Sequence, residues 1–104
     1  MTMPAARVLD QVITGHPCSA ITTIISTLQD KVFIEQSLGA VVGSPLDPTH
    51  TILTGGSCVP HPGMVVNTGS TKVFFGGIPA ARVGDSADIS GAVSSGSAKV
   101  FIGG

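Results

Sequence analysis

The sequence is poor in charge and in large aromatic side chains. Only 11% of its 104 residues are charged, the net charge is −1, and Trp and Tyr are absent. A chain with so few cations has no basic surface for nucleic acid, and it has no acidic tail either. We therefore expect no nucleic acid among its partners.

Long apolar runs are also missing. No stretch approaches the roughly 20 apolar residues that cross a bilayer as a helix, and the first residues do not resemble a secretory signal. We expect a soluble chain without a classical export signal. In a reducing compartment, free thiols are favoured over a disulfide between Cys18 and Cys58, which are the two cysteines.

What the chain has instead is glycine, proline and β-branched residues. Its 14 glycines and 7 prolines are typical of short strands joined by tight turns. A chain of this length forms one domain, residues 1–104, with a modest core. The mean hydropathy of +0.48 is high for that size, which predicts that a protein partner covers part of the surface.

Two short segments recur and define a repeat. A strand that begins Lys-Val-Phe occurs at residues 72–77 and 99–104, and in degraded form at 31–36. A turn segment related to Pro-Ala-Ala-Arg-Val-Gly-Asp occurs at 3–10 and 78–85, and in degraded form at 38–44. These copies predict an all-β domain with approximate threefold repetition. The three units cover approximately residues 3–36, 37–77 and 78–104.

Each unit predicts a hairpin that ends in the Lys-Val-Phe strand. The predicted pairs are residues 22–26 with 31–34, 64–67 with 72–75, and 92–94 with 99–102. Gly69 and Gly96 lie in two of the connecting turns, while Leu28 takes that position in the first unit. The lysines that begin these strands are expected to face solvent at strand edges. They are Lys31, Lys72 and Lys99.

Arginine and aspartate recur three residues apart in the turn segments. Arg7 precedes Asp10, and Arg82 precedes Asp85 at the same spacing. An arginine at such a position either binds an anion or stabilises the turn. Because the aspartate recurs with it, we predict that the two side chains pair and stabilise the turn.

All histidines and cysteines lie in the long loops of two units. These residues are His16, Cys18, His50, Cys58 and His61. Imidazole and thiolate are the ligands that zinc prefers, and the two-residue gap between Cys58 and His61 lets both side chains reach one ion. The alternative interpretation is that the histidines are ordinary loop residues, and the spacing alone leaves both interpretations open.

No catalytic arrangement is visible in the sequence. No serine lies in a recognisable context with a histidine and an acid, and no glycine-rich loop precedes a helix to bind phosphate. The aspartates Asp10, Asp47, Asp85 and Asp88 lie in predicted turns, where Asp favours hydrogen bonds to nearby backbone.

At its repeats the chain resembles the PAAR-repeat family. The Pro-Ala-Ala-Arg motif stands at residues 4–7 and 79–82, and the Val-Phe-Ile-Gly-Gly segment at 100–104 is also similar to the family. The likeness is weaker over residues 28–43. The resemblance implies a small cone of three strand-hairpin repeats related by pseudo-threefold symmetry, with long metal-binding loops at its tip. Such cones cap the trimeric β-helical spike of contractile injection machines.

The resemblance also implies a structural zinc ion, one per chain, near the point of the cone. Family members hold it with three histidines and one cysteine. Matched onto this sequence, the ligands are His16, His50, Cys58 and His61, with Cys18 as the most plausible substitute.

The implied function is that of a non-enzymatic tip protein, with one chain per spike trimer. It would sharpen the spike for membrane piercing without stable insertion, in a phage tail baseplate or in a bacterial type VI secretion system. In the second case we expect cytoplasmic assembly and secretion without a signal peptide, with effector cargo as a further partner. The alternatives are a small zinc-dependent hydrolase or toxin effector, and a metal-binding adaptor that does not bind a spike.

Overall fold

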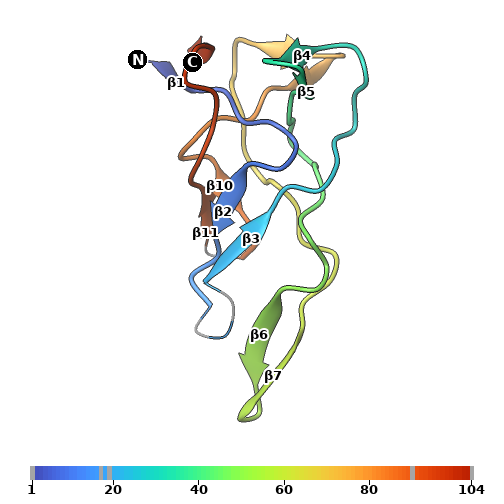
Figure 1. Cartoon of the computed structure of the whole chain (residues 1–104), viewed down its shortest axis with the longest axis vertical. Helices are drawn as coiled ribbons and strands as arrows, with labels where there is room; N and C mark the ends of the chain where they lie inside the picture. Colours follow the sequence, from blue (N-terminus) through green and yellow to red (C-terminus); the bar gives the residue numbers. More distant parts are fainter. Residues whose placement is uncertain (1, 17, 19, 90, 104) are drawn as a thin grey trace.

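The chain forms a cone built from short antiparallel strands, 41 × 26 × 21 Å along its principal axes (Figure 1). The computed structural model describes residues 2–16, 18, 20–89 and 91–103. Within these ranges there are twelve strands and no helix, so none that could span a membrane. The all-β prediction is confirmed. The strands are β1 (Thr2–Pro4), β2 (Gln11–Ile13), β3 (Ile21–Thr23), β4 (Phe33–Ile34), β5 (Ser37–Leu38), β6 (Thr51–Thr54), β7 (Ser57–Pro60), β8 (Phe74–Phe75), β9 (Ile78–Pro79), β10 (Ser86–Ala87), β11 (Gly91–Val93) and β12 (Phe101–Gly103).

A closed ring of six extended segments forms the middle of the cone. Four of them are the strands of one antiparallel sheet, in the order β10-β11-β2-β3. Residues 45–46 and 65–66 supply the other two and close the ring. The closing bridges are Ile24–Leu46, Pro45–Val65 and Val66–Ala87. Closure satisfies the strand edges that would otherwise be open to pairing with another chain.

The pseudo-threefold symmetry is clearest at one ring of backbone hydrogen bonds. The amide of Ala6 donates to the carbonyl of Ala81, Ala81 donates to Ala40, and Ala40 donates to Ala6, each at 3.0 Å. All three alanines are fully buried. Because three backbones approach one another here, each unit has room for little more than a methyl group, which explains the small residues of the repeat.

The core is built in layers of three around this ring of alanines. On the side towards the narrow end, each unit contributes two buried residues of the six-segment ring. They are Val12, Ile24, Leu46, Val66, Ala87 and Val93. On the side towards the wide end, each unit contributes the second residue of its Phe-containing strand. They are Ile34, Phe75 and Ile102. Each layer therefore takes equivalent residues from the three repeats.

The wide end holds three two-stranded pairs, β4-β5, β8-β9 and β1-β12 (Figure 1). In β8-β9 the turn is Gly76-Gly77, with φ of 60° and 84°, as a two-residue type I′ turn requires. In β1-β12 the two ends of the chain pair instead, with Met3 opposite Ile102. The first and last strands thus complete the third copy of the repeat.

These pairs show that the predicted hairpins are wrong. Each Lys-Val-Phe strand pairs with the segment that follows it in the cycle of repeats, and not with the β-branched segment that precedes it. Gly69 and Gly96 are not hairpin turn residues. A Cβ atom at either one would lie 2.7 Å from a backbone carbonyl oxygen, so glycine is required there for close backbone approach.

Side chains, and not hairpin turns, organise the loops before the Lys-Val-Phe strands. The hydroxyls of Ser70 and Ser97 each accept hydrogen bonds from the amides two and three residues further on, at 2.9–3.0 Å. In the first unit the side-chain carbonyl of Gln29 accepts the equivalent bonds at 2.8 Å. The degraded unit therefore keeps the same loop with a longer side chain.

The structure contains both predicted arginine–aspartate pairs. Arg7 donates to the two carboxylate oxygens of Asp10 at 3.0 and 3.1 Å, and Arg82 donates to those of Asp85 at 3.2 and 3.1 Å. Each aspartate also accepts the backbone amide of its arginine at 2.7 Å. The hydrogen bond that Arg7 donates to Asp10 raises the pKa of Arg7, and the one that Arg82 donates to Asp85 raises the pKa of Arg82. The pairs thus stabilise turns.

The turn of the degraded unit offers a test of the repeat. Glu35 and Gln36 replace the Gly-Gly pair and have φ of 52° and 73°, a left-handed conformation that L-residues with side chains adopt at a cost. Gln36→Gly should raise the free energy of unfolding by about 1 kcal/mol. The reciprocal change at the equivalent exposed position, Gly77→Gln, should lower it by a similar amount. Denaturant unfolding measures both, and a loss of stability in Gln36→Gly would contradict the shared turn geometry.

Candidate metal centre

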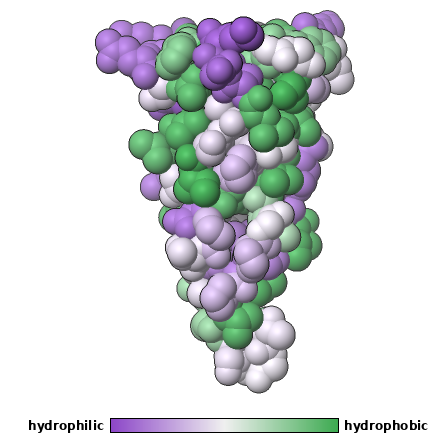
Figure 2. All heavy atoms as spheres, turned by 90° about the vertical axis from the view of Figure 1, so that its right-hand side faces the viewer, coloured by the Kyte–Doolittle hydropathy of each residue, from purple (hydrophilic) through white to green (hydrophobic). Residues whose placement is uncertain are grey.

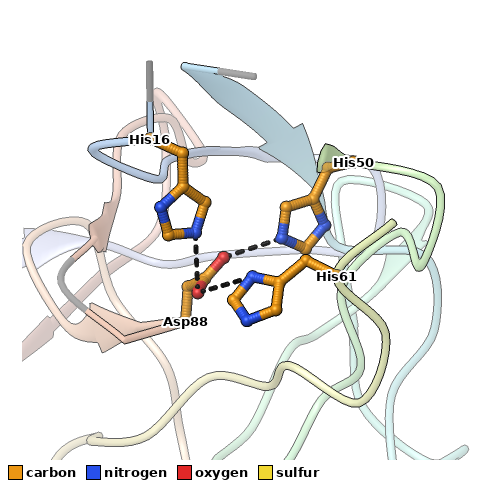
Figure 3. Close-up of side chains that lie close together, drawn as sticks. All are labelled: His16, His50, His61 and Asp88. Atoms are coloured by element: carbon orange, nitrogen blue, oxygen red, sulfur yellow. Dashed lines mark hydrogen bonds and ion pairs between the residues drawn. The ribbon is translucent and has the colours of Figure 1, made fainter. Parts of the chain in front are cut away.

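Three histidines converge on one aspartate between the six-segment ring and the narrow end (Figure 3). His16 follows β2, His50 precedes β6, His61 follows β7, and Asp88 follows β10. The site is therefore assembled from all three repeats. Asp88 has a φ of 62°, a left-handed conformation that Asp tolerates better than most residues. Its carboxylate lies at the centre of the cluster.

Each histidine presents one ring nitrogen to the carboxylate of Asp88. Nε2 of His16 lies 3.1 Å from Oδ1, Nε2 of His50 lies 2.8 Å from Oδ2, and Nδ1 of His61 lies 3.5 Å from Oδ1. The rings of His16 and His50 are parallel, with centroids 5.9 Å apart, and the ring of His61 meets both edge to face.

The cluster is largely withdrawn from solvent. His16 and His50 are each 6% exposed, and Asp88 is 5% exposed. Burial by itself would raise the pKa of the Asp88 carboxyl. The hydrogen bond from the amide of Ile89, together with the contacts to the rings of His16 and His50, outweighs burial, so the pKa of Asp88 lies below its ordinary value. The structure therefore favours a charged carboxylate here.

The donor set fits a metal ion. One ligand atom from each of the four residues can be chosen so that all lie within 4.8 Å of one another. Zinc takes imidazole nitrogen and carboxylate oxygen at roughly 2 Å in a tetrahedron. Within the described part of the chain, Nδ1 of His61 is buried without a hydrogen-bond partner, and a bound cation would satisfy it. The residues present are thus those that a closed, four-coordinate site needs.

A hydrogen bond at the other nitrogen of the His50 ring also supports a bound cation. Nδ1 of His50 bonds the backbone carbonyl of Asp47, so this nitrogen carries the proton. A neutral ring then has a lone pair on Nε2, directed at a carboxylate oxygen of Asp88 only 2.8 Å away. Two acceptors at that distance repel each other. A cation between them, or a second proton on the ring, removes the conflict.

The structure brings together His16, His50 and His61 of the predicted ligand set, but it does not bring Cys58. The sulfur of Cys58 is bonded to that of Cys18, so neither is a thiolate that could ligate metal in this state. The expectation of reduced thiols is thus contradicted by the structure. The disulfide forms because the fold brings together the two long loops that carry these cysteines.

Asp88 is the site residue that the sequence analysis missed. It was assigned to a turn, and it does lie in one, with its carboxylate accepting the next amide at 2.7 Å. Asp47 occupies the equivalent position of the second unit, three residues after Ser44 as Asp88 is three after Asp85. Its carboxylate instead caps Thr49. The next residue differs, since Pro48 after Asp47 has no amide to donate, whereas the amide of Ile89 donates to Asp88.

A family model described as the PAAR motif matches residues 55–104. Residues 55–104 belong to the PAAR-repeat family. The match begins at the turn between β6 and β7, covers both Gly-Gly-containing strand segments and Asp88, and the structure shows the same unit architecture in the residues before it. No curated protein matches the chain. In the described residues the cluster joins the three histidines with a carboxylate, Asp88, and not with a cysteine.

We predict that the metal centre depends on Asp88 and not on Cys58. Asp88→Asn should weaken zinc binding, because the amide offers a neutral oxygen in place of a carboxylate, and should lower stability by several kcal/mol when zinc is present. Asp47→Asn is the matched control and should bind zinc as the unmodified chain does. Calorimetric titration measures both, and equal affinity in the two variants would contradict the assignment.

The disulfide should stabilise the fold independently of the metal. It closes a loop with a sequence separation of 40 residues, for which chain entropy gives about 4 kcal/mol. Cys18→Ser and Cys58→Ser should each lower the free energy of unfolding by up to this amount while keeping zinc affinity. Loss of zinc binding in Cys58→Ser alone would restore Cys58 as a ligand.

Proposed function

We propose that the protein is a non-enzymatic spike-tip protein that caps the blunt end of a trimeric β-helical spike. As a PAAR-motif protein it is associated in general with the spike tip of type VI secretion systems and contractile phage tails. The observation that carries the capping role is the wide end of the cone. There, one exposed phenylalanine from each repeat occupies an equivalent position.

The three phenylalanines are Phe33, Phe74 and Phe101. They are 60%, 53% and 53% exposed, although the residue that follows each of them is buried in the core. Large apolar side chains that remain exposed at equivalent positions favour a partner that covers them. A homotrimer offers three identical surfaces around one axis, and a single chain with three equivalent contacts matches it one to three.

Strand addition supports the same docking mode. The three pairs β4-β5, β8-β9 and β1-β12 each have only two strands and stand together at the wide end (Figure 1). Strands of a β-helical partner can extend such pairs through main-chain hydrogen bonds. Among the described residues the ring in the middle of the cone is closed, whereas the pairs of the wide end keep outer edges that a β-partner can extend.

A structural zinc ion at the narrow end completes the proposal. No residue of β6 or β7 belongs to the buried apolar core, and a metal bound by His16, His50, His61 and Asp88 would join segments of all three repeats near that end. Four protein ligands leave no open position for water or substrate, and three of the four residues are buried. This arrangement supports a structural role over that of a zinc hydrolase.

The proposed location follows from the partner. The chain would lie at the distal tip of a phage tail baseplate, or of a bacterial type VI spike assembled in the cytoplasm and secreted without a signal peptide. We propose that it sharpens the spike for transient membrane puncture, and that any effector cargo is docked to it.

The stoichiometry and the phenylalanines test the capping role. Mixed with the trimeric spike protein of the same genome, the chain should bind as one copy per trimer, as measured by light scattering after size exclusion. Phe74→Ala and Phe101→Ala should each weaken binding about tenfold or more, because each removes buried apolar contact. Ile89→Ala, which truncates a side chain 67% exposed outside the wide end, is the control. Three copies per trimer, or no effect of either phenylalanine, would contradict the proposal.

A further inference from the structure

Charged residues are absent from long segments of this chain. Residues 11–29, 48–71 and 89–98 contain no Asp, Glu, Lys or Arg. These segments belong to all three repeats, and they include the ring strands β2, β3 and β11 and the whole of β6 and β7. The charged residues therefore concentrate in the remaining parts of the chain.

In the structure this pattern becomes a separation between the two ends of the cone. The lysines precede the strands of the wide end, and the arginine–aspartate pairs lie beside those strands, where Arg7 reaches Glu35 and Arg82 reaches the carbonyl of Gly103. Asp47 and Asp88 are the charged residues near the metal centre. Asp88 is buried, and Asp47 is capped onto Thr49. On the face in Figure 2, the strongly hydrophilic colours gather at the wide end, and the narrow end is pale or green.

The hairpin β6-β7 forms the point of the cone (Figure 1). Its strands pair from Thr51 with Pro60 to Thr54 with Ser57, and Gly55-Gly56 make the turn, with φ of 59° and 83°. Leu53 is 50% exposed and Val59 is 36% exposed. The disulfide at Cys58 ties the hairpin to the loop after β2. The point is thus an uncharged, partly apolar hairpin fixed to the body of the protein.

More apolar side chains are exposed between this point and the wide end. Ile13 and Ile21 are direct cross-strand partners in β2-β3 and are 53% and 55% exposed. Ile89, next to Asp88, is 67% exposed. The uncharged surface therefore continues from the hairpin up the flank of the cone.

We propose that this narrow end binds the interfacial region of an uncharged phospholipid bilayer, with the hairpin β6-β7 as the element that enters first. The inference rests on the proposed spike-tip function and names the surface that meets the membrane. Charged side chains are costly to move from water into a membrane, and this surface avoids that cost almost entirely. A protein partner would instead favour charges that fix the orientation of docking.

The backbone limits how deep the hairpin reaches. A two-stranded hairpin leaves outward-facing amides and carbonyls at its edges, and these groups cannot leave water for hydrocarbon without partners. The bound state is therefore reversible and interfacial, at the boundary between headgroups and acyl chains. The charged wide end remains in water, where the spike would dock.

The absence of Trp from the chain provides a clean fluorescent reporter. In the zinc-loaded protein, Leu53→Trp should show a blue shift on addition of phosphatidylcholine vesicles, and brominated lipids should quench it. Phe74→Trp, at the wide end, is the matched reporter and should show neither change. An unshifted Leu53→Trp, or equal shifts in the two variants, would overturn the proposal.

Co-sedimentation of the unmodified chain removes the contribution of the introduced Trp. It should sediment with phosphatidylcholine vesicles, and Leu53→Asp should reduce the bound fraction at least tenfold, whereas Phe33→Asp should not. Binding that requires anionic phosphatidylglycerol would overturn the proposal, because it would indicate attraction by the lysines. Spike binding by Leu53→Asp, which should be unchanged, separates the two proposals: lost vesicle binding with intact spike binding in the unmodified chain would overturn only this inference.

Discussion

The structure depends on the close approach of three backbone segments around one axis, where the amides and carbonyls of Ala6, Ala40 and Ala81 hydrogen-bond in a circle. Their separation leaves space for methyl groups only. A wider layer of Ile34, Phe75 and Ile102 lies on one side, and the ring of six buried residues lies on the other. Because each layer takes equivalent residues from the three repeats, the chain needs three similar units, and its two ends must pair to complete the third.

The cone narrows beyond the six-segment ring, and a different kind of interaction must hold the chain together there. An apolar core needs several side chains that exclude water from one another, and a cone loses that possibility near its point. The structure places a polar cluster there, His16, His50, His61 and Asp88, with the Cys18–Cys58 disulfide beside it. These interactions bind few residues strongly, so they suit a place where burial contributes little.

The repeat could be predicted from the sequence because local backbone and side-chain requirements make the same residue types recur in each unit. The Gly-Gly turns need positive φ, the alanines need to be small, and Arg7 and Arg82 pair three residues along the chain. The strand pairing could not be predicted. The residues around Gly69 are typical of a hairpin turn, but glycine is required there because another backbone segment approaches closely. Likewise Asp47 and Asp88 have equivalent positions, and only the three-dimensional convergence of the loops selects Asp88. The sequence analysis expected reduced thiols because it assumed a reducing compartment, and the sequence alone does not show that the loops place Cys18 next to Cys58.

X-ray absorption at the zinc edge of the loaded protein tests most directly whether this cluster is the metal centre. The account predicts a first shell of nitrogen and oxygen only, at roughly 2.0–2.2 Å, with the multiple scattering that imidazole rings produce. A sulfur neighbour at about 2.3 Å would contradict it. That result would mean that the disulfide opens when zinc binds, and that a cysteine, not Asp88, completes the site.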